Sequence, residues 1–155
     1  MQRAIVGFHT DEEGHWVADL SCGHGQHTRH RPPLSERAWV QSPEGRAARI
    51  GTELDCLRCD RLEIPETWQP YRRTKEFSEA SVPAALLADH TTAKGVWARI
   101  HVVRGKLRYA IQAPLEREEV LVPGTPGIVA PELPHHVEPL GEAAFYVEFW
   151  RAPKG

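Results

Sequence analysis

Three cysteines and several histidines in the first sixty residues are the residue types best suited to chemistry in this chain. Cys22 is followed closely by His24 and His27, and Cys56 and Cys59 form a Cys-x-x-Cys pair. Three thiolates and one imidazole are a ligand set that a tetrahedral zinc ion takes. The spacing therefore predicts one zinc ion bound by Cys22, Cys56, Cys59 and one of His24 or His27.

Two other interpretations of these cysteines remain open. A Cys-x-x-Cys pair can be a redox-active dithiol, although such pairs normally open a helix in a βαβ setting. The cysteines could also be small buried residues beside solvated histidines such as His30. A zinc ion with four protein ligands would be structural, because no position is open to substrate. An odd number of cysteines argues against a disulfide framework, so we expect a cytoplasmic protein.

A second group of histidines occurs in the later part of the chain. His90 precedes a run of alternating apolar residues, and His135 follows a proline-rich segment. If these two histidines meet at the mouth of a barrel, Glu148 or His101 could complete a site for a second divalent metal ion, such as iron, manganese, nickel or zinc. The alternative is a metal-free pocket, in which these side chains cap turns, pack or face solvent.

The elements that must position these residues are short, and most are strands. The 155 residues include 13 prolines and 12 glycines, which favour turns over long helices. Residues 4–8 and 15–20 predict a hairpin, whereas residues 46–54 give only a weak signal for a helix or strand. Residues 80–88 predict one helical turn that Pro83 interrupts.

From residue 96 the apolar residues alternate, which is typical of strands. Residues 96–102 and 106–111 predict a hairpin that turns at Arg104-Gly105. Further strands are expected at 119–122, 127–130 and 144–150. Repeated short strands separated by turns indicate a sandwich or barrel, so the fold class is mainly β.

The composition changes near residue 60 and indicates two domains. All three cysteines and five of the nine histidines precede this point, and a proline-punctuated connector follows it. We predict a zinc-ribbon-like Cys/His module over residues 1–61 and a β-barrel over residues 62–155. The first part has 8 Lys and Arg against 9 Asp and Glu, and the second has 11 against 12, so we expect no nucleic-acid partner. No segment is apolar enough to span a bilayer, so we expect no membrane partner.

The residues from Cys22 to Pro33, which read Cys-Gly-His-x-Gln-His-x-Arg-His-x-Pro-Pro, and from Leu54 to Asp60 carry a specific motif. With these motifs, residues 1–61 resemble a family of small bacterial domains of unknown function. This resemblance implies no activity, and it supports a metal site only through the ligands named above.

A second pattern is distributed over residues 62–152. It includes His90-x-Thr-x-x-Gly95-x-Trp97, then Pro131-x-x-x-His135-x-Val137-Glu138, and then Phe145-x-Val147-x-Phe149. This part resembles the cupin-type domain at the N-terminus of tellurite-resistance protein B. The resemblance implies a cupin barrel, or double-stranded β-helix, that is commonly a homodimer and encloses a pocket.

These observations lead to one expected function and two alternatives. We expect a metal-binding, cupin-type protein that binds a small molecule or an oxyanion and acts in stress or tellurite-type resistance. One alternative is a metal-dependent cupin enzyme, an oxygenase or isomerase; the other is an interaction protein with a zinc module, dimerised by its barrel. The sequence contains no catalytic triad, phosphate loop or paired-carboxylate motif, so catalytic and cofactor-binding residues stay unknown and enzyme activity stays open.

Overall fold

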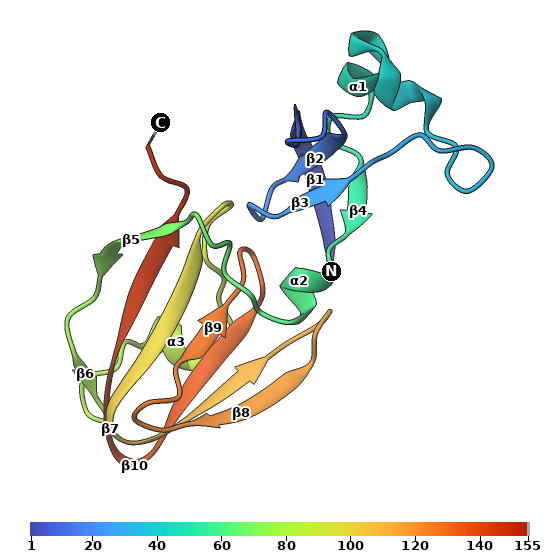
Figure 1. The fold of residues 1–155 in the computed structure, drawn as a ribbon. Helices are drawn as coiled ribbons and strands as arrows, with labels where there is room; N and C mark the ends of the chain where they lie inside the picture. The colour runs from blue at the N-terminus through green and yellow to red at the C-terminus, as the bar shows by residue number, and fades with distance from the viewer. Residues whose placement is uncertain (155) are drawn as a thin grey trace. The chain divides into compact units, whose positions relative to one another are not determined.

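Strands make up most of the regular structure in this computed structural model, which describes residues 1–154. They form two separate sheets, one in a first unit, Met1–Arg58, and one in a second unit that begins at Cys59 (Figure 1). The expected mainly β fold is therefore confirmed. No helix within residues 1–154 has the length and hydropathy that a membrane-spanning helix requires.

The first unit is built on an antiparallel sheet with the strand order β3-β2-β1-β4. The predicted hairpin is formed by β1 and β2, and the Asp11 carboxylate in its loop accepts hydrogen bonds of 2.9 Å from the backbone N–H groups of Glu13 and His15. The strands of this sheet are β1 (Gln2–Thr10), β2 (Trp16–Leu20), β3 (Gly25–His27) and β4 (Glu53–Asp55).

Two short helices connect β3 to β4. The 3-10 helix η1 (Ala38–Gln41) is followed by α1 (Pro43–Ala48), whose first turn is capped by the Ser42 hydroxyl as it accepts a 3.0 Å hydrogen bond from the Gly45 N–H. The weak signal over residues 46–54 thus covers the end of a helix and the start of β4. Few large side chains are fully buried in this unit, so core burial alone gives it limited stability.

The second unit has a six-stranded sheet whose main path is β5-β10-β7-β8, with β6 paired to β10 and β9 paired to β7. Its two longest strands, β7 and β10, pair along most of their length (Figure 1). The strands are β5 (Gln69–Arg73), β6 (Phe77–Ser78), β7 (Trp97–Ile111), β8 (Arg117–Leu121), β9 (Gly127–Val129) and β10 (His135–Arg151), and the short helix α3 (Ala84–Leu87) precedes β7.

The predicted hairpin at Arg104-Gly105 is wrong, because residues 97–111 form the single strand β7. Gly105 has a φ of +74°, and a β-carbon there would lie 2.1 Å from the Glu142 carbonyl oxygen. The glycine therefore bends β7 beside an irregular stretch of β10 instead of reversing the chain. Strand β10 is also longer than the expected strand at 144–150, since it begins at His135.

Candidate metal centre and ligand pocket

The pairing of β1 with both β2 and β4 brings the distant cysteines together. Both neighbours run antiparallel to β1, so their final residues lie beside its beginning: Leu20 pairs with Ile5, and Asp55 pairs with Gln2. Cys22 and Cys56 follow these two strand ends. The Cys56 N–H also donates a 2.8 Å hydrogen bond to the Met1 carbonyl, which fixes the second cysteine against the start of β1.

Two local structures orient the four side chains. After β2, the Leu20 and His24 backbones are joined by a 2.9 Å hydrogen bond, and Gly23 takes the φ of +94° that this tight turn requires. After β4, the one-turn helix α2 (Leu57–Asp60) carries Cys59 back toward Cys56. The boundary between the two units falls inside this helix, one residue before Cys59.

The ligand atoms of Cys22, His24, Cys56 and Cys59 all lie within 4.8 Å of one another. His24 Nδ1 is 3.4 Å from the Sγ atoms of both Cys22 and Cys56, and these two sulfurs are 3.9 Å apart. A tetrahedral zinc ion would set sulfur–sulfur distances of about 3.8 Å and sulfur–nitrogen distances of about 3.6 Å, given its usual bond lengths. The cluster could therefore bind a metal ion without large rearrangement.

The site is buried and favours positive charge. All four side chains are at most 5% exposed, and no disulfide joins the cysteines in the part of the chain described. Burial by itself lowers the pKa of His24, but contact with the Cys22 and Cys56 sulfurs outweighs it and raises the pKa to about 9. The same sulfurs would attract a metal cation.

The other histidines of this segment lie outside the cluster. The exposed His27 ring has its Nε2 3.0 Å from the Asp11 carboxylate, and His30 Nδ1 accepts a 2.9 Å hydrogen bond from the Arg37 N–H. Of the two histidines that the sequence offered as the fourth ligand, the structure thus brings only His24 to the cysteines. Within residues 1–154, no other group of three or more potential metal ligands is found.

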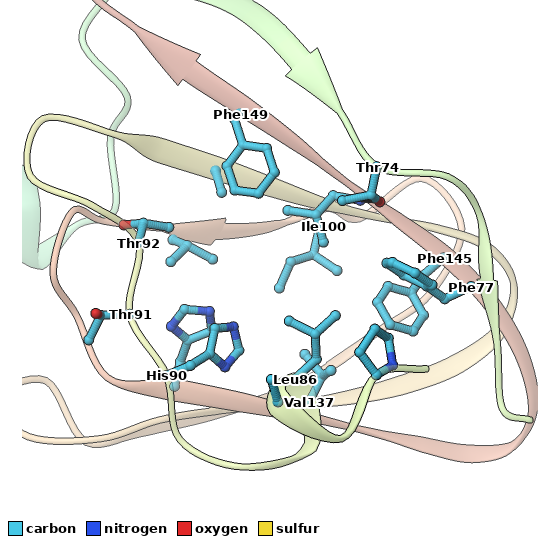
Figure 2. A pocket seen from close by; sticks show the side chains of 16 residues that line it. Thr74, Phe77, Leu86, His90, Thr91, Thr92, Ile100, Val137, Phe145 and Phe149 are labelled. Carbon is cyan, nitrogen blue, oxygen red and sulfur yellow. Dashed lines mark hydrogen bonds between the residues drawn. The ribbon is translucent and has the colours of Figure 1, made fainter. Parts of the chain in front are cut away.

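The second unit contains a cavity of about 250 Å³. The described residues that line it include two histidines but no Asp, Glu, Lys or Arg. Figure 2 shows His90 on one side of the cavity and Phe77 and Phe145 on the other. Most of the wall is apolar and comes from α3 and from strands β6, β7, β9 and β10: Phe77, Leu86, Ala98, Ile100, Val129, Val137, Phe145, Val147 and Phe149.

His90 and His135 meet in the wall of this cavity, which was one of the two possibilities that the sequence left open. Their backbones form a two-hydrogen-bond bridge of 2.9 and 3.0 Å, and their ring centroids are 4.2 Å apart. His90 Nδ1 lies 3.0 Å from the Ala88 carbonyl and His135 Nδ1 lies 2.8 Å from the Leu133 carbonyl. A carbonyl can only accept, so each Nδ1 carries a proton, and in a neutral ring the Nε2 is then an acceptor.

His135 is neutral at ordinary pH. Burial, which leaves the residue 3% exposed, is the main cause that lowers its pKa to about 4, and the neighbouring His90 ring adds to this effect. His135 therefore offers a lone pair to the cavity instead of a positive charge.

The expectation that Glu148 or His101 completes a metal site with this pair is wrong. Both side chains project from the opposite face of the β7–β10 sheet, where His101 Nε2 lies 3.2 Å from Glu148 Oε1 and Trp150 Nε1 donates to the same oxygen at 3.0 Å. Successive side chains of a strand alternate between faces, so Glu148 faces away from the cavity that Val147 and Phe149 line.

Part of the pocket wall could not be predicted from the sequence. Leu86 comes from the single-turn helix α3, and Phe77 from the two-residue strand β6. Elements this short contain no periodic pattern from which the orientation of a side chain could be predicted.

Two family matches follow the order of the two units. Residues 6–63 match the family described as Protein of unknown function (DUF3565), and residues 72–147 match the TehB-like domain. The two resemblances expected from the motifs are confirmed at this level, whereas the cupin assignment stays a prediction. No curated protein matches the chain.

Two solved structures show a likeness of fold. A protein from E. coli strain K12 is 23% identical with a TM-score of 0.55, and the match covers 59% of this chain and 98% of that one. TehB from Haemophilus influenzae is 21% identical with a TM-score of 0.52, and the match covers 56% of this chain but only 32% of TehB. At these identities the likeness extends to the fold alone.

Proposed function

We propose that this protein binds a small molecule in the cavity of its second unit and one structural zinc ion at the cysteine cluster. The observation that carries the proposal is the histidine pair. Backbone carbonyls hold both Nδ1 protons, so two Nε2 acceptors remain in a wall that is otherwise mostly apolar. Such a cavity, with a few convergent polar atoms, is the usual form of a small-molecule site.

The lining indicates the chemical class of the ligand. The phenylalanine and aliphatic side chains favour an apolar body, and the two Nε2 atoms favour a hydrogen-bond donor such as a hydroxyl or amine. Since an engineered cavity of about 150 Å³ holds benzene, the larger space here suits a compound of one or two small rings. No Lys or Arg in the described lining would neutralise an oxyanion, so a neutral donor fits this cavity better.

The proposal that the first metal is zinc rests on ligand chemistry. Three sulfurs and one imidazole nitrogen at tetrahedral spacing favour zinc over harder ions such as magnesium or calcium. Four protein ligands leave no position for substrate. The ion would therefore stabilise the small first unit and take no part in a reaction.

Phenol and anisole test the pocket, because both are small aromatic rings but only phenol donates a hydrogen bond. Titration calorimetry should show phenol binding more tightly than anisole by up to about tenfold, the usual strength of one neutral hydrogen bond. The double variant His90→Phe, His135→Phe keeps both rings but removes both acceptors, so the preference for phenol over anisole should disappear. His101→Phe, on the opposite sheet face, should keep it. Equal affinity for both compounds in the unmodified protein would reject the proposal.

A metal-dependent enzyme, such as an oxygenase or isomerase, is the second candidate, and one observation favours it. Histidines that bind metals usually donate their other ring N–H to a carboxylate or carbonyl, as His90 and His135 do. Only these two ligands are available in the described lining, so water or substrate would have to supply the others. Titration of the zinc-loaded protein with Fe²⁺ or Mn²⁺ tests this candidate, which predicts one further ion that His135→Phe abolishes.

Homodimer formation and a role in tellurite-type or other stress resistance are further parts of the proposal. The TehB-like match supports the resistance role, although the matched part is only a fraction of TehB itself. The third candidate is an interaction protein whose zinc module docks to a partner macromolecule. It would require a partner that binds the first unit.

A further inference from the structure

The first unit contains a second, polar cavity of about 180 Å³, separate from the cysteine cluster. Arg29, His30 and Arg31, which follow β3, line it together with Trp16 and other residues. None of the described residues that line it is acidic. Two guanidinium groups thus gather at one cavity in a unit whose total charge is close to neutral.

One donor atom of a residue that lines this cavity has no hydrogen-bond partner. Arg29 Nε is buried and makes no hydrogen bond within residues 1–154. A buried N–H group without a partner costs free energy, so such groups in proteins usually receive a ligand, a water molecule or an ion. The position therefore points to an acceptor that would enter the cavity.

His30 supplies a further donor. Its Nδ1 accepts the 2.9 Å hydrogen bond from the Arg37 N–H, so in the neutral ring the proton is on Nε2. The loop itself is held in place, because the Arg31 and Ser35 backbones form two hydrogen bonds of 2.7 and 2.8 Å. The three consecutive donors are therefore presented by a fixed segment.

Two acidic side chains in the neighbouring hairpin loop contact histidines, one of which, His15, also lines the cavity. Asp11 Oδ2 lies 3.0 Å from His27 Nε2, and Glu13 lies 3.4 Å from His15 Nδ1. Arg46 adds positive charge near the cavity, since its guanidinium lies 3.7 Å from the centroid of the Trp16 ring. Arg46 is therefore a third arginine close to a residue of the lining.

From these observations we propose that this cavity is a binding site for a tetrahedral oxyanion, such as phosphate, sulfate or a phosphate ester. Two guanidinium groups and one imidazole N–H match a dianion with at least three acceptor oxygens. A carboxylate has one charge and two oxygens and would leave part of the donor set unused.

Calorimetric titration of the full zinc-loaded chain with inorganic phosphate tests this proposal, with sulfate, acetate and phenyl phosphate as comparison ligands. Phosphate and sulfate should bind, and acetate should bind at least about tenfold more weakly, because each charge-assisted hydrogen bond contributes strongly. Tighter binding of phenyl phosphate than of phosphate would identify an ester as the preferred ligand, whereas tighter binding of phosphate would identify the free ion.

The variants Arg31→Gln and Arg29→Lys separate binding from folding. Arg31 is exposed, so its replacement should leave the fold intact and weaken phosphate binding about tenfold. Arg29→Lys keeps the charge but loses the planar donor fork, and it should also weaken binding. Arg104→Gln, an exposed change of equal charge in the second unit, should have no effect.

Three results of the titrations themselves would overturn the proposal. These are absence of phosphate and sulfate binding to the unmodified protein, unchanged affinity in Arg31→Gln, or equal weakening in Arg104→Gln. Binding of a DNA duplex without binding of free phosphate would also overturn it, since the cavity would then be part of a nucleic-acid surface.

Discussion

Which histidine completes the cysteine cluster is decided at the scale of single residues. His24 Nδ1 lies 3.4 Å from two sulfurs, whereas His27 Nε2 lies against the Asp11 carboxylate. We predict that His24→Asn lowers zinc affinity by tenfold or more, since it removes one of four ligands, and that His27→Asn leaves it unchanged. Competition with a chelator of known affinity would measure both. Loss of zinc in His27→Asn alone would contradict the assignment.

The ligand types, but not their geometry, could be predicted from the sequence. Cysteines and histidines at zinc-like spacing identified the cluster, whereas the choice of His24 depends on the tight turn after β2. The exclusion of Glu148 could have been predicted, because its position in the alternating strand places it on the face opposite Val147 and Phe149.

The lowered pKa of His135 makes the stability of the second unit depend on pH. Above pH 6.5 the imidazole is neutral in both states; as the pH falls, the unfolded ring takes up a proton that the folded ring accepts only near pH 4. The free energy of unfolding should therefore decrease by up to roughly 3 kcal/mol between these values through this residue.

His135→Asn removes this titrating group. Denaturant unfolding at pH 7 and pH 5 should show a smaller loss of stability for the variant than for the unmodified protein. Parallel losses in the two proteins would mean that His135 takes up its proton equally in the folded and unfolded states.

At the scale of elements, the bend in β7 explains why residues 96–102 and 106–111 were correctly expected to be extended and why a hairpin turn between them was wrongly expected. Buried apolar residues occupy even positions before Gly105, such as Ile100 and Val102, and odd positions after it, such as Leu107 and Tyr109. A tight turn and a bulge both produce this change of phase, so the sequence pattern could not distinguish them. Pairing with β10 on both sides of Gly105 selects the bulge over the turn. This long-range pairing cannot be predicted from the local sequence.

Gly105→Ala tests the role of this bend. The alanine would have to adopt a positive φ, and its β-carbon would lie 2.1 Å from the Glu142 carbonyl oxygen. Gly141→Ala is the matched control, because Gly141 has a φ of +84° but no atom within 4 Å of the added carbon. We expect Gly105→Ala to lower the free energy of unfolding by about 2 kcal/mol more than the control does. Denaturant titration would measure both variants. Equal losses of stability in the two would show that the backbone moves away from the added β-carbon at position 105 at no cost in free energy.

At the scale of the whole molecule, the division into two units could be predicted from composition. The change near residue 60 lies close to the observed division between Arg58 and Cys59. The cavity of the second unit could not be predicted in the same way, because its wall combines side chains from five separate elements. The expected homodimer and cytoplasmic location stay predictions.

If the second unit has its own core, it should fold without the first. Trp97, Tyr109 and Phe145 are fully buried within it, so a fragment of residues 62–155 has a large apolar core without any metal. We predict a β-rich circular dichroism spectrum and a cooperative melting transition that a chelator does not change. A fragment without such a transition would mean that the two units depend on one another for folding.

At the largest scale the protein is expected to hold one metal ion at the cysteine cluster and none in the ligand cavity of the second unit. Elemental analysis of the purified full-length protein, together with the double variant His90→Phe, His135→Phe, tests this expectation most directly. We predict one zinc ion per chain in both proteins and no other transition metal in either. A protein without zinc, or a second metal ion that the double variant loses, would contradict the account.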